Sequence, residues 1–406
     1  MPRQTTTMLM KKTLTITSII TLSTFILVGA VYFFKQQGPR LTINVTPKDA
    51  FIEIENKIVG EGSITLKLNK GQYHIGARKD NFLRYDSKIT LEKDATINIV
   101  LEKIPVSSQI TAPLPKLTKA IWLNNTQLVG YQPEENKIYL IDVSNGDWKK
   151  LGFEPPENTT FLTVSDPMVI AFAQATSATN RAEAKIFNLT TENTTSVNFE
   201  SAVNPTSLSL SPNGKQLAFL SDHDYTRQTA NINIASITPD GKIGQITKTV
   251  LQKTYSSVFW INESVLGLSI YVDAPFSNQL HFFSPITKIT TESSLRFSAL
   301  AVQPKTGEVA ALTQDGLAII KPGVNPKIIY PYKDNEAIKF SWTSMNQIAV
   351  IQQPDTASAN VTIINIETNE SMSAKINTKE PIRTLLPSPD GTLYFLSPSG
   401  ILRKLK

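Results

Sequence analysis

The chain has 406 residues and no cysteine, which excludes disulfide scaffolds, thiolate metal sites and cysteine nucleophiles. Hydrophobic residues make up 41% and charged residues 18%, which is enough apolar material for packed cores in roughly two to three domains. Residues 1–40 contribute +5 of the net charge of +6, so the other 366 residues carry only +1, and a basic nucleic-acid-binding domain is not expected.

An uncharged stretch of 22 residues, Thr13–Phe34, follows the basic amino-terminal tail. A helix rising about 1.5 Å per residue would span roughly 33 Å here, close to the hydrocarbon thickness of a bilayer. Lysines bracket the stretch, and more basic residues precede it than follow it, which favours a cytoplasmic amino terminus. We therefore expect a cytoplasmic tail at residues 1–12, a transmembrane helix at residues 13–34, and extracytoplasmic domains at the cell membrane.

A cleaved secretory signal is the alternative interpretation of this segment. Val28-Gly29-Ala30 offers small residues near a possible cleavage point. Apolar residues nevertheless continue from Val31 to Phe34, beyond the point where a signal peptide should turn polar, which favours an uncleaved anchor.

Strict alternation of apolar and polar residues begins after Gly38-Pro39. This period of two, broken by turn residues, predicts a small β domain with one face of each sheet in a core. Val59–Gly62 is one predicted turn, and Gly60, Gly62 and Gly71 are expected to adopt positive φ. The predicted strands are Leu41–Val45, Phe51–Glu55, Ile64–Leu68, Tyr73–Ile75, Ile89–Leu91 and Ile97–Leu101.

Residues 40–103 resemble a PEGA domain. The resemblance rests on Val45-Thr46-Pro47, on Ile54–Lys57 with the following Gly60, and on the Leu-x-x-Gly-x-Tyr pattern of Leu68–Tyr73. The family usually has Thr-Pro soon after that glycine, whereas this chain has Glu61-Gly62-Ser63. The resemblance implies a compact β-sandwich with a spacer or adhesion role and supplies no catalytic residues.

A repeat follows a proline-containing linker at residues 104–119. Apolar strands open at Ala120, Thr160, Ser207, Ser257, Ser298, Lys339 and Arg383, with spacings of 40, 47, 50, 41, 41 and 44 residues. A period in the forties, built from short strands, is typical of a β-propeller. Residues 120–406 are therefore predicted to form a propeller, and the seven openings predict seven blades.

Two turns of nearly the same sequence support this interpretation. Ser211-Pro212-Asn213-Gly214 and Ser388-Pro389-Asp390-Gly391 resemble the hairpins of TolB-like and WD-repeat-like propellers, in which such turns join the two innermost strands of a blade. The last repeat, from Ile382 to Lys406, has room for only about three strands. We expect the linker segment Ser107–Thr111 to supply the fourth.

Few residues in the chain suggest chemistry. Its three histidines are His74, His223 and His281, and only Asp222-His223-Asp224 combines carboxylates with imidazole in a way that could bind a divalent metal. A local hydrogen-bonded turn is the preferred interpretation, because adjacent side chains point in different directions. His74 is expected to be a half-exposed strand residue.

The four tryptophans allow two interpretations. Trp122, Trp260 and Trp342 lie in opening strands, and Trp148 lies near the end of the first repeat. They could form an aromatic platform in a central channel, but packing between blades is preferred because large aromatic residues dominate cores.

No nucleophile elbow or glycine-rich phosphate loop occurs, so we predict no catalytic, cofactor-binding or metal residues and no cofactor. The expected function is that of a membrane-anchored cell-envelope binding or scaffold protein, whose propeller recognises a protein or a cell-wall polysaccharide. The alternative is a propeller enzyme that acts on wall polysaccharide or peptide.

Overall fold

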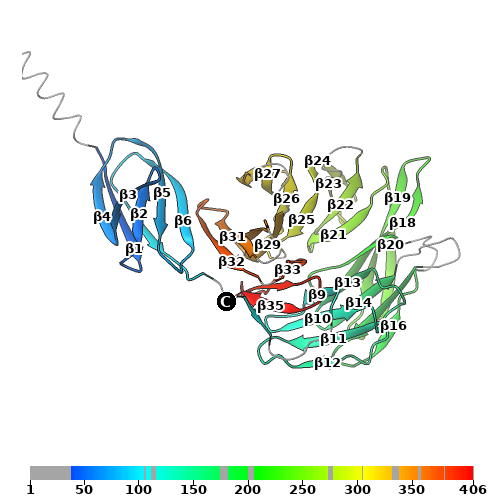
Figure 1. The fold of residues 1–406 in the computed structure, drawn as a ribbon. Helices are drawn as coiled ribbons and strands as arrows, with labels where there is room; N and C mark the ends of the chain where they lie inside the picture. Colours follow the sequence, from blue (N-terminus) through cyan, green and yellow to red (C-terminus); the bar gives the residue numbers. More distant parts are fainter. Residues whose placement is uncertain are drawn as a thin grey trace, which may run out of the picture. The chain divides into compact units, whose positions relative to one another are not determined.

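The computed structural model describes residues 38–104, 107–110, 116–173, 182–199, 205–272, 278–303, 305–331, 338–354, 358–378 and 380–405. Strands and turns make up all of the regular structure in these residues. None of them forms a helix long and apolar enough to cross a membrane, and the predicted helix Thr13–Phe34 lies outside the described residues. The chain divides into two compact units, Met1–Lys103 and Ile104–Lys406 (Figure 1).

The described part of the first unit contains two sheets. In one, β1 pairs with β4 in antiparallel and with β7 in parallel orientation. In the other, the order is β6-β5-β2-β3, with every pair antiparallel. The apolar residues of β1 alternate with polar ones and are buried, as the period of two predicts. The strands are β1 (Arg40–Thr46), β2 (Phe51–Ile54), β3 (Lys57–Glu61), β4 (Ser63–Lys67), β5 (Gly71–Arg78), β6 (Arg84–Leu91) and β7 (Ala95–Val100).

One turn prediction in this unit is wrong. The segment predicted as a turn around Gly60 is the strand β3, which pairs with β2. The reversal lies earlier, at Glu55 and Asn56, whose φ angles of 50° and 61° suit a two-residue hairpin turn. Of the three glycines expected to adopt positive φ, only Gly62 does so, with a φ of 70°. The other two, Gly60 and Gly71, lie in strands instead.

The described part of the second unit forms seven four-stranded antiparallel sheets, here numbered 1 to 7 in chain order. Sheets 1 to 6 each consist of four consecutive strands. Their strands are β9 (Lys119–Trp122), β10 (Gln127–Gln132), β11 (Lys137–Asp142), β12 (Trp148–Lys150), β13 (Phe161–Ser165), β14 (Met168–Ala173), β15 (Glu183–Asn188), β16 (Thr194–Ser196), β17 (Ser207–Leu210), β18 (Gln216–Asp224), β19 (Thr229–Ile237), β20 (Ile243–Leu251), β21 (Ser257–Asn262), β22 (Val265–Tyr271), β23 (Asn278–Phe283), β24 (Thr290–Phe297), β25 (Ala299–Val302), β26 (Val309–Thr313), β27 (Gly316–Ile320), β28 (Lys327–Tyr330), β29 (Ile338–Ser344), β30 (Gln347–Gln352), β31 (Ser358–Asn365) and β32 (Ser371–Asn377).

Sheet 7 joins the two ends of this unit. Three of its strands are β33 (Thr384–Pro387), β34 (Leu393–Leu396) and β35 (Leu402–Leu405), and the fourth is β8 (Ser107–Gln109) from the linker. β8 pairs antiparallel with β35, with Gln109 opposite Arg403. The prediction that the linker supplies the last strand is therefore confirmed for Ser107–Gln109.

The seven sheets close into a ring around their first strands. β9, β13, β17 and β21 contact one another in turn, as do β25, β29 and β33, and β33 returns to β9. Figure 1 shows β33 and β35 beside the first sheet of the unit. Each neighbouring pair of sheets shares a buried apolar cluster. The cluster between sheets 7 and 1 includes Ile110, Leu128 and Leu402, so the ends of the unit are held by the same apolar packing as its middle.

Candidate functional site

The carboxyl ends of four first strands line an open hollow on the inner side of the ring, which we call the central hollow. It has a volume of about 390 Å³ and is lined by β9, β25, β29 and β33 with the turns that follow them. Trp122, Trp342 and Met345 form part of its apolar lining, and Lys305 is the one charged side chain among the described residues that line it. An apolar concavity with a few polar groups is the usual form of a binding pocket.

Three tryptophans connect neighbouring sheets. The indole Nε1–H of Trp122 donates to the Leu386 carbonyl at 3.1 Å, on the first strand of the preceding sheet. Trp260 and Trp342 make the equivalent bonds to Ser209 and Ala301, at 3.1 and 3.0 Å. The preferred interpretation, packing between blades, is thus confirmed for these three residues, although Trp122 and Trp342 also line the central hollow.

Trp148 does not follow this pattern. It lies on β12, the last strand of sheet 1, and is 42% exposed. Its ring meets that of Tyr139 edge-on within the same sheet, with 5.3 Å between centroids. The prediction of packing between blades is wrong for Trp148, because this tryptophan sits on an outer strand rather than on an opening strand.

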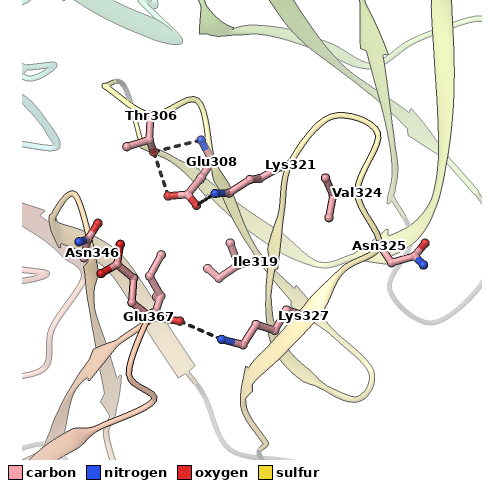
Figure 2. Close-up of a pocket in the computed structure, with 10 residues that line it drawn as sticks. Thr306, Glu308, Ile319, Lys321, Val324, Asn325, Lys327, Asn346 and Glu367 are labelled. Atoms are coloured by element: carbon pink, nitrogen blue, oxygen red, sulfur yellow. Dashed lines mark hydrogen bonds and ion pairs between the residues drawn. The ribbon is translucent and has the colours of Figure 1, made fainter.

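A second hollow, the lateral groove, lies between sheets 5 and 6 and also measures about 390 Å³ (Figure 2). The buried Glu308 carboxylate pairs with the Lys321 ammonium at 2.7 Å and accepts a hydrogen bond from the Thr306 hydroxyl at 3.0 Å. The Glu308 carboxylate raises the pKa of Lys321. Lys327 donates to the Ile366 carbonyl at 2.9 Å across the groove. Charged side chains therefore line the groove, but the charges of Glu308 and Lys321 neutralise each other.

The two hollows adjoin on one face of the ring. In each antiparallel sheet, the turn between the first and second strands and the turn between the third and fourth strands lie at the same edge. We call the face of the ring that these turns form the turn face. Lys305 lines the central hollow while Thr306 lines the lateral groove, and Met345 and Asn346 are divided in the same way. Consecutive Cα atoms lie about 3.8 Å apart, so only the turns of sheets 5 and 6 separate the two hollows.

Large apolar side chains project from the turn face beside these hollows. Met345 is 52% exposed and Val324 is 59% exposed, each at the edge of a hollow. Ile286 and Ile289, in the turn before β24 of sheet 4, are also exposed. Exposed apolar residues beside a hollow are typical of a protein interaction site.

Asp222-His223-Asp224 lies at the end of β18, where the pairing with β19 is interrupted by a bulge. The Asp222 carboxylate accepts hydrogen bonds from Asn231 at 2.8 Å and from Lys248 at 3.1 Å. The His223 Nε2 lies 2.9 Å from the Tyr255 carbonyl, and Asp224 accepts from the backbone at Thr226 and Arg227. The three side chains thus engage different partners, and no metal-binding group of acids and histidines occurs among the described residues.

The remaining histidines lie in strands. His74 is partly buried on β5, with its Nε2 3.5 Å from Asp86 Oδ1. His281 is fully buried on β23, and its Nδ1 lies 3.2 Å from the Tyr255 hydroxyl. Burial lowers the pKa of His281, Lys253 lowers it further, and Glu292 opposes the shift. Burial, with a smaller contribution from Glu292, raises the pKa of Tyr255 to about 12.

We expect the stability of the second unit to fall as the pH drops through the range in which His281 titrates. The folded state depresses the His281 pKa, so its contribution is complete above the pKa of an unfolded histidine, about 6.5, and is lost at lower pH. Melting temperatures measured from pH 8 to pH 5 should decline less steeply in Lys253→Met, which removes one cause of the depression, and least in His281→Gln. Equal slopes in wild type and His281→Gln would contradict this assignment.

Neither hollow could be predicted from the sequence. Their lining residues are ordinary strand and turn residues whose shared feature is a position near the end of a first or third strand of a repeat. Lys305 and Glu308 lie within and beside the segment Gln303–Gly307, whose proline and glycine weakly resemble the two Ser-Pro turns described above, and this is a local signal that could have indicated them.

Comparison with known proteins identifies the two units separately. Residues 39–105 match the PEGA domain family, where the sequence analysis expected residues 40–103. A search of curated proteins found no match. Two solved structures are similar to the chain. Their sequence identity is low, so the similarity shows the fold alone. One is the β-propeller domain of Myceliophteria thermophila Cps50 (Swd1), with 14% identity, 74% of this chain and 99% of that chain covered, and a TM-score of 0.49.

The other similar structure comes from a crystal structure of the mitotic checkpoint complex. It has 13% identity and a TM-score of 0.50, and the alignment covers 73% of this chain and 93% of that chain. This likeness agrees with the ring of four-stranded sheets described above. The chain therefore contains a PEGA domain at residues 39–105, followed by a β-propeller fold of the WD40-like kind.

Proposed function

We propose that this protein is a membrane-anchored binding protein of the cell envelope, whose seven-bladed propeller docks a protein partner on its turn face. Residues 13–34 are the anchor, residues 1–12 face the cytoplasm, and the PEGA domain and propeller are extracytoplasmic. The near-neutral charge of residues 41–406 disfavours nucleic acid as the partner.

The observation that carries this proposal is the pairing of the central hollow with exposed Met345 at its edge. Protein interfaces are enriched in methionine and aromatic residues and centre on an apolar pocket that a partner side chain fills. The adjoining lateral groove, with Lys321, Lys327 and Glu367, supplies the polar surroundings such an interface needs. An apolar side chain of the partner would enter the central hollow, and its polar neighbours would lie along the groove.

A protein fits this face better than a polysaccharide. Sugar rings bind by stacking on exposed aromatic faces, but Trp342 is buried and Trp122 is only partly exposed. These rings support the wall of the hollow. The exposed apolar groups are instead the aliphatic side chains of Val324, Ile286 and Ile289 and the flexible thioether of Met345, which adapts to protein surfaces.

Site-specific photocrosslinking in native membranes tests the proposal. A photoreactive residue at Met345 should yield one dominant protein adduct, and excess purified wild-type protein should suppress the adduct while the Met345→Asp variant should not. The control position is Val250, which is exposed on the outer strand β20 of sheet 3. Adducts that form equally at both positions, or that ignore the competitor, would contradict docking at the turn face.

The alternative, an enzyme acting on wall polysaccharide or peptide, would need carboxylates in a hollow. Glu308 and Glu367 both line the lateral groove, but Glu308 is held by Lys321. Turnover of wall fragments that disappears in Glu367→Gln would favour the enzyme. Absence of turnover with an intact Met345 adduct would favour the binding protein.

Protease treatment of intact cells tests the proposed location. Mass spectrometry should detect released peptides from residues 120–406 before the membrane is breached. Protection of these peptides until lysis would place the propeller on the inner side and contradict the envelope assignment.

A further inference from the structure

Three basic residues lie at the opposite ends of the strands that line the central hollow. Lys119 begins β9, Lys339 is the second residue of β29, and Arg383 immediately precedes β33. The carboxyl ends of these three strands converge in the central hollow. Since neighbouring first strands also contact one another around the ring, the starts of β9, β29 and β33 meet at the other mouth of the ring's centre.

Two interactions link these residues across sheets 6, 7 and 1. The Lys339 ammonium donates a hydrogen bond to the carbonyl of Ile382, the residue before Arg383. Lys119 and Arg383 stand at the starts of the contacting strands β9 and β33, and burial, with a smaller contribution from the charge of Arg383, lowers the pKa of Lys119. Burial also lowers the pKa of Lys339. The three cations therefore form one group, which we call the basic mouth.

The basic mouth has no ion-pair partner within the described part of the chain. None of its three residues forms an ion pair there. Glu380, the described acid nearest to Arg383 in sequence, is bonded to Arg403 at 3.1 Å and to the Ser399 hydroxyl at 2.6 Å. Burial disfavours the charged forms of Lys119 and Lys339, and an arriving anion would offset that cost.

An unused hydrogen-bond donor lies beside the same residues. The side-chain oxygen of Gln353 accepts from the Ile382 N–H at 2.8 Å, which fixes the amide next to Arg383. Its Nε2 is buried and makes no hydrogen bond in the described residues. Buried amide donors are nearly always bonded, so this group is poised to meet an acceptor.

We propose that Lys119, Lys339 and Arg383 form a binding site for an oxyanion, the phosphate or carboxylate group of a ligand that enters the ring's centre from this mouth. The Arg383 guanidinium offers a planar pair of donors to such a group, and the two lysines add charge. The site lies on the face opposite the turn face, so it stands whether or not a protein docks there.

Isothermal titration of the full-length protein in non-ionic detergent, with inorganic phosphate and separately with acetate, tests the site. We expect saturable binding of at least one anion, weakened about 10- to 100-fold in Lys119→Met and in Arg383→Gln, the usual effect of losing a charged hydrogen bond. Binding of phosphate alone, acetate alone or both identifies the chemical class. Lys215→Met, an exposed lysine of a turn in sheet 3, is the matched control and should bind as wild type does.

Arg383 is exposed, so its substitution should leave the fold intact, and melting curves of each variant check this. A second readout is the pKa of Lys119, followed by NMR of ε-¹³C-labelled lysine, which should rise when the anion binds. No saturable binding of either anion would overturn the proposal. So would equal weakening by Lys215→Met, or an unchanged Lys119 pKa at saturating anion.

Discussion

Replacing Ser107–Ile110 by four glycines should lower the free energy of unfolding of the second unit by about 3–6 kcal/mol. The substitution removes the Ile110 side chain, which is buried in the cluster between sheets 7 and 1, and truncating a buried isoleucine costs about 2–5 kcal/mol. It also weakens the pairing of β8 with β35, whose backbone hydrogen bonds are worth about 0.5–1.5 kcal/mol each. Urea denaturation followed by circular dichroism measures the change.

The control for this experiment is Ile286→Ala, at a residue that is 80% exposed. Its free energy of unfolding should stay within about 0.5 kcal/mol of wild type. If the four-glycine variant melts as wild type does, β8 does not close the ring. If Ile110→Ala alone reproduces the whole loss, closure rests on the buried side chain rather than on strand pairing.

Trp260→Ala should destabilise the propeller by about 3–5 kcal/mol, the usual cost of emptying a large buried aromatic site. Trp260 is 5% exposed, packs with Val258 and Leu266, and bonds the Ser209 carbonyl of the neighbouring sheet. Trp260→Phe retains most of the apolar packing but leaves that carbonyl without its donor, so we expect a loss of about 1–3 kcal/mol. Far-ultraviolet circular dichroism should follow unfolding, because the substitutions alter tryptophan fluorescence.

Trp148→Ala is the matched control, since Trp148 is 42% exposed and its ring pairs with Tyr139 of its own sheet, as described above. It should cost less than about 1.5 kcal/mol, the upper worth of an aromatic pair beyond area burial. Equal destabilisation by Trp260→Ala and Trp148→Ala would show that the bonds between sheets carry no special weight.

Much of the architecture could be predicted from the sequence. The seven predicted openings coincide with the first strands β9, β13, β17, β21, β25, β29 and β33, each within one residue. This succeeded because each repeat is one four-stranded unit whose turn chemistry is local. Gly214 and Gly391, for example, adopt the positive φ that their Ser-Pro turns require. Closure by the linker followed from counting strands in the last repeat.

Turn-forming residues gave a wrong prediction where two neighbouring segments could each form the turn. The chain around Gly60 carries glycines that suit a turn, yet Glu55 and Asn56 turn first, and the pairing of β3 with β2 then holds Gly60 in a strand. The pairing of strands across the sheet decided where the chain turns. The turn propensity of single residues does not include the energy of that pairing.

What the sequence by itself determined is the β class, the PEGA pattern, the blade period and the linker strand, because each depends on residues close together in the chain. Only the tertiary structure decided that Trp122, Lys305 and Trp342 line one hollow, and that Lys119 and Arg383 stand at the starts of two contacting strands. Ring closure brings together strands that are separated by up to about the whole length of the propeller. Which side chains converge then depends on register and strand direction, and a repeat period does not specify either.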